Sequence, residues 1–119
     1  MSLTKENTLY AVSGLSEIER VTALSFLQGA VYCWCKNRPD EWFALRDLVG
    51  GDNTHWSGTP LMPLYEKHSN LSDAQAFEAA AKDVGWLLKH VVVNDIRVFE
   101  TKKAGLVRQY KWQKFVPNA

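Results

Sequence analysis

Two cysteines and three histidines are the thiol and imidazole side chains of this chain that could hold a metal such as zinc. Cys33 and Cys35 are one residue apart, and His55, His68 and His90 are scattered along the sequence. A structural zinc site needs about four ligands, with cysteine pairs spaced as in C-x₂₋₄-C. Residues i and i+2 of a helix point to different faces, so two cysteines in a helical segment do not share a metal. We therefore predict no metal site and no cofactor, and expect two reduced cysteines that serve helix packing.

The residue types needed for catalysis also lack a suitable pattern. A Cys/His nucleophilic pair needs a thiolate in an accessible, electropositive place, whereas Tyr32 and Trp34 beside Cys33 favour burial. Gly50-Gly51 is not followed by the Lys-Ser/Thr of a phosphate-binding loop. The sequence therefore predicts that the protein is not an enzyme.

The loop at residues 50–58 is an alternative place for a small-molecule or partner site, because loops often carry function. It holds His55 and Trp56 among Gly, Asp, Asn and Ser. We expect Trp56 mainly to anchor this loop to the body of the protein.

Charge divides the chain into two unequal parts. Residues 1–96 hold eight Lys/Arg and twelve Asp/Glu, whereas residues 97–119 hold six Lys/Arg and one Asp/Glu. A local basic surface on a nearly neutral protein can attract a polyanion. The alternative is that these lysines protect an exposed strand edge from unwanted pairing.

Two long helices are predicted. Ser16 and Glu19 form a capping box, and apolar residues then recur every three or four positions until Arg38-Pro39, which indicates a helix over 16–36. An alanine-rich segment capped by Ser72 indicates a second helix over 72–94, with Asn94 as its C-terminal cap. Gly85 lies inside it, and we expect a close helix crossing there.

Shorter elements are expected between these helices and after them. Residues 41–45 fit a small strand, residues 46–49 one helical turn stopped by glycine, and Thr59-Pro60 starts a helix that ends near His68. Residues 96–99 and 106–115 alternate in the manner of strands, with a turn over 102–105. Tyr110 and Trp112 share one strand face, and we expect them to pack on the helices, the alternative being base stacking.

This order of elements predicts an α+β fold, mainly helical, with a C-terminal β-hairpin. By its length of 119 residues the chain is one domain, which can bury roughly two-thirds of its unfolded surface. We divide it into an N-terminal extension at 1–14 and a single domain at 15–116. No apolar run reaches about 18 residues, and residues 1–7 lack the pattern of a signal peptide. Together with reduced cysteines, this predicts a cytoplasmic protein without a membrane span.

The element order resembles the winged-helix domain of the helix-turn-helix superfamily. The segment 42–49 resembles a first strand running into the second helix, and residues 87–99 resemble the recognition helix running into the wing. The resemblance covers about residues 15–116. One departure is the segment 50–70, which is longer than the tight turn expected between the second and third helices of that family.

The resemblance implies binding to double-stranded DNA, with the third helix in the major groove and the wing on phosphate or the minor groove. The candidate contacts are Arg97, Lys102, Lys103, Arg108 and Lys111 on the hairpin and Lys82 and Lys89 on the long helix. That helix carries three acidic and two basic residues, so we expect the hairpin to make most of the DNA contacts.

The alternative function is a protein-interaction module on the same scaffold, acting as a homodimer or adaptor without a nucleic-acid role. Apolar residues surround much of the first helix, among them Phe26, Tyr32 and Trp34. One small core cannot accept all of them, and this predicts a self-interface or a protein partner.

Overall fold

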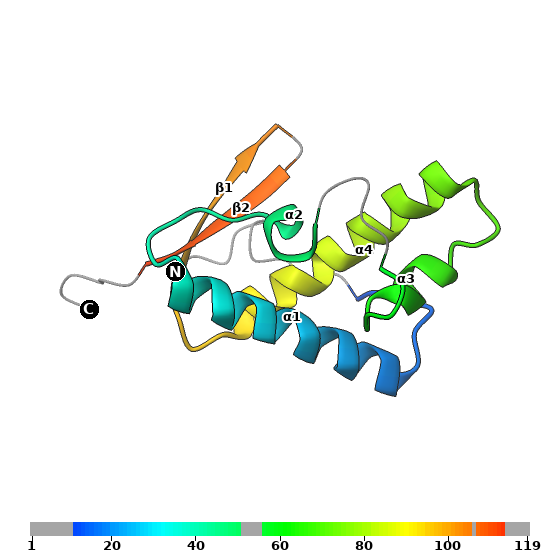
Figure 1. The fold of residues 1–119 in the computed structure, drawn as a ribbon, viewed down its shortest axis with the longest axis horizontal. Coiled ribbons are helices and arrows are strands. Elements are labelled where there is room, and N and C mark those ends of the chain that lie inside the picture. The colour runs from blue at the N-terminus through cyan, green and yellow to red at the C-terminus, as the bar shows by residue number, and fades with distance from the viewer. Residues whose placement is uncertain (1–10, 51–55, 106, 114–119) are drawn as a thin grey trace.

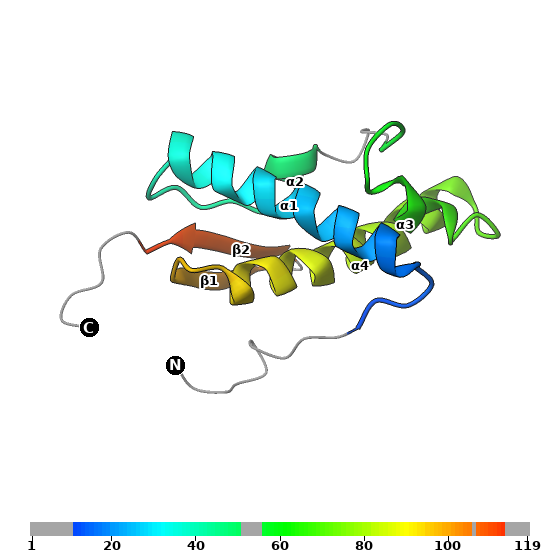
Figure 2. The same cartoon turned by 90° about the horizontal axis from the view of Figure 1, so that it is seen from below.

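The computed structural model describes residues 11–50, 56–105 and 107–113. These residues form four helices and an antiparallel two-stranded hairpin, which confirms the mainly helical α+β fold (Figure 1). Helices α1 and α4 pack on each other, and the hairpin follows α4 at one end of the molecule (Figures 1 and 2). None of the helices in this described part has the length and apolar character that a membrane crossing requires.

Helix α1 spans Glu17–Asn37 and begins at the predicted capping box. The Ser16 hydroxyl accepts a hydrogen bond from the Glu19 N–H at 3.1 Å, and the Glu19 carboxylate accepts one from the Ser16 N–H at 2.8 Å. These two bonds satisfy backbone donors that a helix start leaves free. The buried face of α1 consists of Ala23, Leu27, Val31 and Cys35.

The expected strand at 41–45 is reduced to one bridge. Phe43 exchanges two backbone hydrogen bonds of 2.8 Å with Tyr110 in the hairpin. Helix α2, Leu45–Val49, follows directly, and the Asp47 carboxylate caps it by accepting from the Ala44 N–H at 2.7 Å. Gly50 ends α2 with a φ of 97°, as predicted for a glycine stop.

Helix α3 spans Met62–Glu66, so the predicted start at Thr59-Pro60 is wrong. Thr59 forms a turn before the helix instead. Its hydroxyl donates to the Trp56 carbonyl at 2.8 Å and accepts from the Leu61 N–H at 3.2 Å. This turn brings Trp56 inward, where it is buried and lies 5.4 Å from the Phe77 ring, so Trp56 anchors the loop as expected.

Helix α4 spans Asp73–Asn94, and the Ser72 hydroxyl caps it by accepting from the Gln75 N–H at 3.3 Å. Asn94 is the last helical residue and Asp95 is the cap, which corrects the prediction for Asn94. The close helix crossing expected at Gly85 is also wrong, because a Cβ placed there meets no heavy atom within 4 Å.

The hairpin consists of β1, Phe99–Ala104, and β2, Val107–Trp112. Ala104 pairs with Val107, so the turn begins at Gly105, whose φ of 65° suits a tight hairpin. The predicted turn over 102–105 is therefore wrong, and Lys102 and Lys103 belong to β1. The first strand also starts later than predicted, because residues 96–98 lie outside it.

Aromatic residues attach the hairpin to the helical core. Phe43 is fully buried, and its ring lies 5.6 Å from Trp34, 6.1 Å from Phe99 and 5.9 Å from Tyr110. Burial raises the pKa of the Tyr110 phenol to about 12. Packing of Tyr110 against the body, which we predicted, is thus confirmed, and its ring is not free to stack on a base.

A buried carboxylate joins α1, α4 and the hairpin. The Asp95 side chain is 1% exposed. It accepts hydrogen bonds from Gln28 Nε2 at 2.7 Å and from the backbone N–H and Nη1 of Arg97, both at 2.8 Å. The Arg97 guanidinium also lies 4.9 Å from the Tyr32 ring centre and 5.5 Å from that of Trp112.

These contacts determine the ionisation of Asp95. Burial by itself raises the pKa of the carboxyl, but the hydrogen bonds from Arg97 and Gln28 and the Arg97 charge outweigh it, so the pKa lies below its ordinary value. Because the pKa is lower in the folded chain, ionised Asp95 stabilises the fold at pH values above its unfolded pKa of about 3.9. This stabilisation is lost as the pH falls through the pKa of the folded state.

We predict that Asp95→Asn lowers the free energy of unfolding by roughly 2 kcal/mol at neutral pH, because Arg97 loses a charged hydrogen-bond partner. The loss of stability between pH 5 and pH 2 should be smaller in this variant than in the native chain. Urea unfolding at a series of pH values measures both effects, with Glu78→Gln on exposed α4 surface as the control. An acid dependence unchanged by Asp95→Asn would contradict the prediction.

We predict that Gly85→Ala raises the free energy of unfolding by roughly 0.5–1 kcal/mol, because alanine favours a helix and space for its methyl group is present. Gly105→Ala is the matched control with the opposite sign. It should lower stability by about 1 kcal/mol, since alanine is strained at positive φ. Urea denaturation gives both values, and a destabilised Gly85→Ala would show that this glycine serves the folded monomer.

Candidate nucleic-acid interface

The pairing register divides the hairpin side chains between two faces. Directly paired residues point to the same side, and the side alternates along each strand. Phe99 with Trp112 and Thr101 with Tyr110 belong to the side that includes the buried Tyr110. The opposite side carries Glu100, Lys102, Gln109 and Lys111, which with Trp42 we call the outer hairpin face.

Trp42 completes the outer hairpin face from outside the hairpin. The neighbouring Phe43 points into the core and pairs with Tyr110, so Trp42 lies on the other side of the sheet. The Lys102 Nζ lies 4.1 Å from the centre of the Trp42 ring, and the Lys111 Nζ lies 5.2 Å from it. Two ammonium groups are thus held around one indole.

The electrostatics of this face are mixed but mainly positive. Glu100 Oε2 lies 3.4 Å from Lys111 Nζ, which offsets part of that charge. The cation–π contacts are worth about 0.5–1 kcal/mol each at an exposed site and leave N–H groups available for other acceptors. The face therefore offers two ammonium donors beside an indole ring, an arrangement suited to phosphate contact.

The remaining basic residues of the hairpin lie elsewhere. Lys103 pairs with Arg108 on the opposite side from Lys102, near the turn. Arg108 Nη1 donates to the Thr101 hydroxyl at 3.2 Å, and Arg97 is held by Asp95 at the hairpin base. The predicted set of five hairpin residues is therefore divided, and Lys102 and Lys111 are the pair that the fold brings together.

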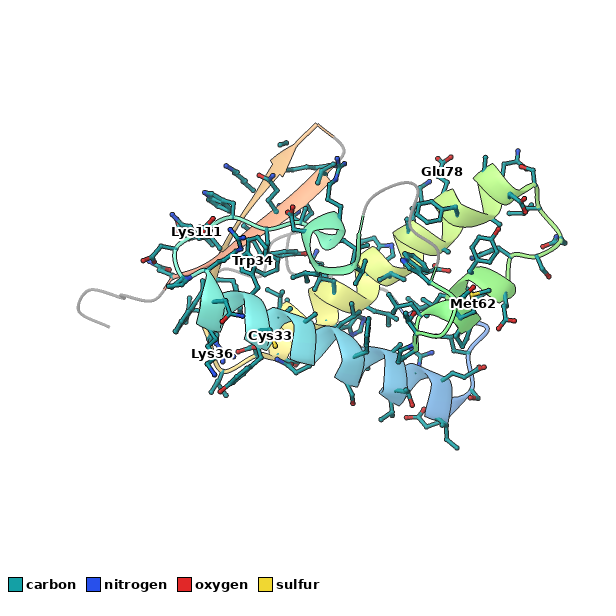
Figure 3. The ribbon with its side chains drawn as sticks, viewed as in Figure 1. Cys33, Trp34, Lys36, Met62, Glu78 and Lys111 are labelled. Atoms are coloured by element: carbon teal, nitrogen blue, oxygen red, sulfur yellow. The ribbon has the colours of Figure 1, made fainter. Side chains whose placement is uncertain are left out.

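The two predicted contacts on α4 differ from each other. Lys82 is exposed, one turn after Glu78. Lys89 is buried at 8% exposure, with its Nζ 5.4 Å from the Trp86 ring centre. Figure 3 shows Lys111 on the hairpin and Glu78, four residues before Lys82, on the opposite half of the molecule.

Trp42 is the candidate site residue that the sequence analysis missed. Its strand-like segment was recognisable from the alternation of Trp42 and Phe43. The contact with Lys102 and Lys111 depends on pairing with β2, about 67 positions later in the chain, as the Phe43–Tyr110 bridge shows. Local patterns carry no information about such a pairing.

Groups with other chemistry are dispersed. Within the described residues, no three His, Cys, Asp or Glu side chains converge as metal ligands. Cys35 is buried, which raises the pKa of its thiol, but Cys33 is exposed, so the burial expected for Cys33 is wrong.

The Asp83 carboxylate pairs with Lys67 at 2.7 Å and His68 at 2.9 Å, which ties the end of α3 to α4. His55 lies outside the described residues.

An open surface hollow of about 590 Å³ lies between α1 and α2. It is lined by Ala30, Cys33, Trp34, Asn37, Arg38, Asp47 and Leu48. The Asp47 carboxylate caps α2, and Arg38 pairs with Glu41 at 3.5 Å. Its charged groups are therefore engaged within the fold.

Comparison of the chain with models of known protein families, with curated proteins and with solved structures gave no match.

Proposed function

We propose that this protein binds double-stranded DNA through the outer hairpin face. The observation that carries the proposal is the arrangement of Lys102 and Lys111 around the Trp42 ring on an exposed side of the sheet. Phosphate neutralisation by lysine supplies much of the affinity of proteins for DNA, and the Trp42 ring holds both ammonium groups on one side of the sheet.

The arrangement of the strands supports a winged-helix scaffold for this function. The Phe43 bridge places residues 42–44 beside β2, so the order across the sheet is bridge segment, β2, β1. In a winged helix the first short strand also lies beside the hairpin. The five-residue α2 and the additional α3 before α4 are departures that follow from the long segment between Gly50 and Ser72.

In this proposal the hairpin makes most of the DNA contacts, and α4 makes fewer. Helix α4 carries three acidic and two basic residues, and one of these, Lys89, is buried. An acidic helix is repelled by phosphate, so sequence reading by α4 in the major groove is disfavoured. Contact led by a wing predicts binding that is strongly salt-dependent and weakly sequence-dependent.

We predict that Lys102→Gln weakens duplex binding and reduces the slope of log affinity against log salt by about 1, because one phosphate contact is lost. Lys103→Gln is the matched control, since it makes the same change on the same strand but on the opposite side of the sheet. Fluorescence anisotropy with a labelled duplex over a salt series measures both slopes.

Two outcomes would contradict this proposal. One is the absence of duplex binding by the folded native chain at low salt. The other is a larger effect from Lys82→Gln on α4 than from Lys102→Gln, which would assign the contact to the helix instead of the hairpin.

We further predict that Glu100→Gln tightens duplex binding by roughly twofold to fivefold, because it removes a carboxylate 3.4 Å from Lys111 that competes with phosphate. Glu78→Gln, the same change on α4 at the far end of the molecule, should have a much smaller effect. Equal gains from both variants would show that only the overall charge matters. That result would count against a contact at this face.

The second candidate function is a protein-interaction module, and exposed apolar residues in the last turn of α4 and just after it favour it. Ile96 is 95% exposed, and Val93 and Val98 are also exposed. Exposed apolar surface is a common feature of protein contacts. The salt series separates the two candidates, because a folded chain that binds no duplex at any salt concentration favours the protein-interaction module. If the protein binds DNA through the outer hairpin face, Ile96→Ser should leave the DNA affinity unchanged.

A further inference from the structure

Helix α1 presents a largely exposed face, on which the Arg97 guanidinium lies over the ring of Tyr32. Ile18 is 79% exposed, Val21 50% and Tyr32 54%. Figure 1 shows α1 along the lower edge of the molecule, with α2, α4 and the hairpin on its other side. Six exposed residues at helical spacing form the middle of this face, which we call the α1 stripe: Ile18, Thr22, Ser25, Gly29, Tyr32 and Lys36.

The centre of the α1 stripe consists of small residues. The backbone conformation at Gly29 does not require glycine, because the residue lies inside a regular helix. A Cβ placed at Gly29 meets no heavy atom within 4 Å, so packing within the monomer does not require glycine either. Glycine is the least favourable residue except proline in a helix interior. Packing within the monomer therefore does not require this glycine, and its small size permits the close approach of a second helix.

The α1 stripe is complementary to itself in an antiparallel arrangement. A two-fold axis between Ser25 and Gly29 places each of these residues opposite the other in a second copy. The same axis places Thr22 opposite Tyr32 and Ile18 opposite the aliphatic stem of Lys36. The small central residues permit a close approach, and the larger ends supply apolar contact.

Charge favours the same orientation. The first turn of α1 contains Glu17 and Glu19, and its last turn contains Lys36. Antiparallel copies bring the acidic turn of one helix to the basic turn of the other, at both ends of the contact. Parallel copies would bring like charges together.

We propose that the α1 stripe binds a second copy of this chain, with the two α1 helices antiparallel and in contact at Ser25 and Gly29. The interface is isologous, as in most dimers with two-fold symmetry. It lies on a different element from the outer hairpin face and is independent of DNA binding.

Gly29→Gln tests the proposal by its opposite effects on folding and on dimerisation. Glutamine is a good helix former and fits the open surface of the monomer, so the thermal stability of α1 at low concentration should hold or rise. Between two closely packed helices the same side chain acts as a wedge. The dimer dissociation constant, measured by sedimentation equilibrium, should rise about tenfold or more.

Gly85→Gln is the matched control, because Gly85 also lies in a helix with open space at its Cβ but on α4. It should leave the dimer dissociation constant unchanged. A native chain that sediments as a monomer throughout the micromolar range would overturn the proposal. So would a dimer that Gly29→Gln leaves intact.

A charge exchange tests the antiparallel orientation. Lys36→Glu should weaken the dimer by roughly twofold to fivefold, because it faces Glu17 of the second copy. The double variant Glu17→Lys/Lys36→Glu restores opposite charges across the interface and should recover most of this loss. Because each change opposes the helix dipole, circular dichroism must show that both variants keep α1 folded. A further loss of dimer in the folded double variant would contradict the orientation.

Discussion

The buried carboxylate of Asp95 is the contact on which the rest of the arrangement depends. It lies between the end of α4 and the hairpin, and it accepts hydrogen bonds from Gln28 on α1 and from Arg97. A charge removed from water is tolerated only when it is paired and hydrogen-bonded. Because Arg97 also covers the rings of Tyr32 and Trp112, a rotation of the hairpin base would leave two opposite charges without partners.

This constraint decides which hairpin residues reach solvent. With the base held by Asp95, Tyr110 turns toward the Phe43 ring in the core, and the alternation of the strands places Lys102 and Lys111 on the other side. The bridge at Phe43 then brings Trp42 to those two lysines. One ion pair and one backbone bridge thus create the outer hairpin face from three segments that are distant in the sequence.

Elements that depend on neighbouring residues were predictable from the sequence. The capping residues Ser16 and Ser72 start α1 and α4 at the expected positions, because a cap is a contact between residues three apart. The hairpin turn was predicted too early, at Lys102, because the sequence shows a polar cluster but not the register. Pairing of Thr101 with Tyr110 settles that register and leaves the turn to Gly105.

The sequence by itself determined the two long helices, their N-terminal caps Ser16 and Ser72, the presence of a hairpin and the concentration of basic residues after residue 96. Only the tertiary structure decided which basic residues are exposed together. Lys89 is buried whereas Lys82 on the same helix is exposed, and Lys102 and Lys103 point to opposite sides. Exposure and direction depend on which elements pack on a given residue, and those contacts are made by segments far apart in the chain.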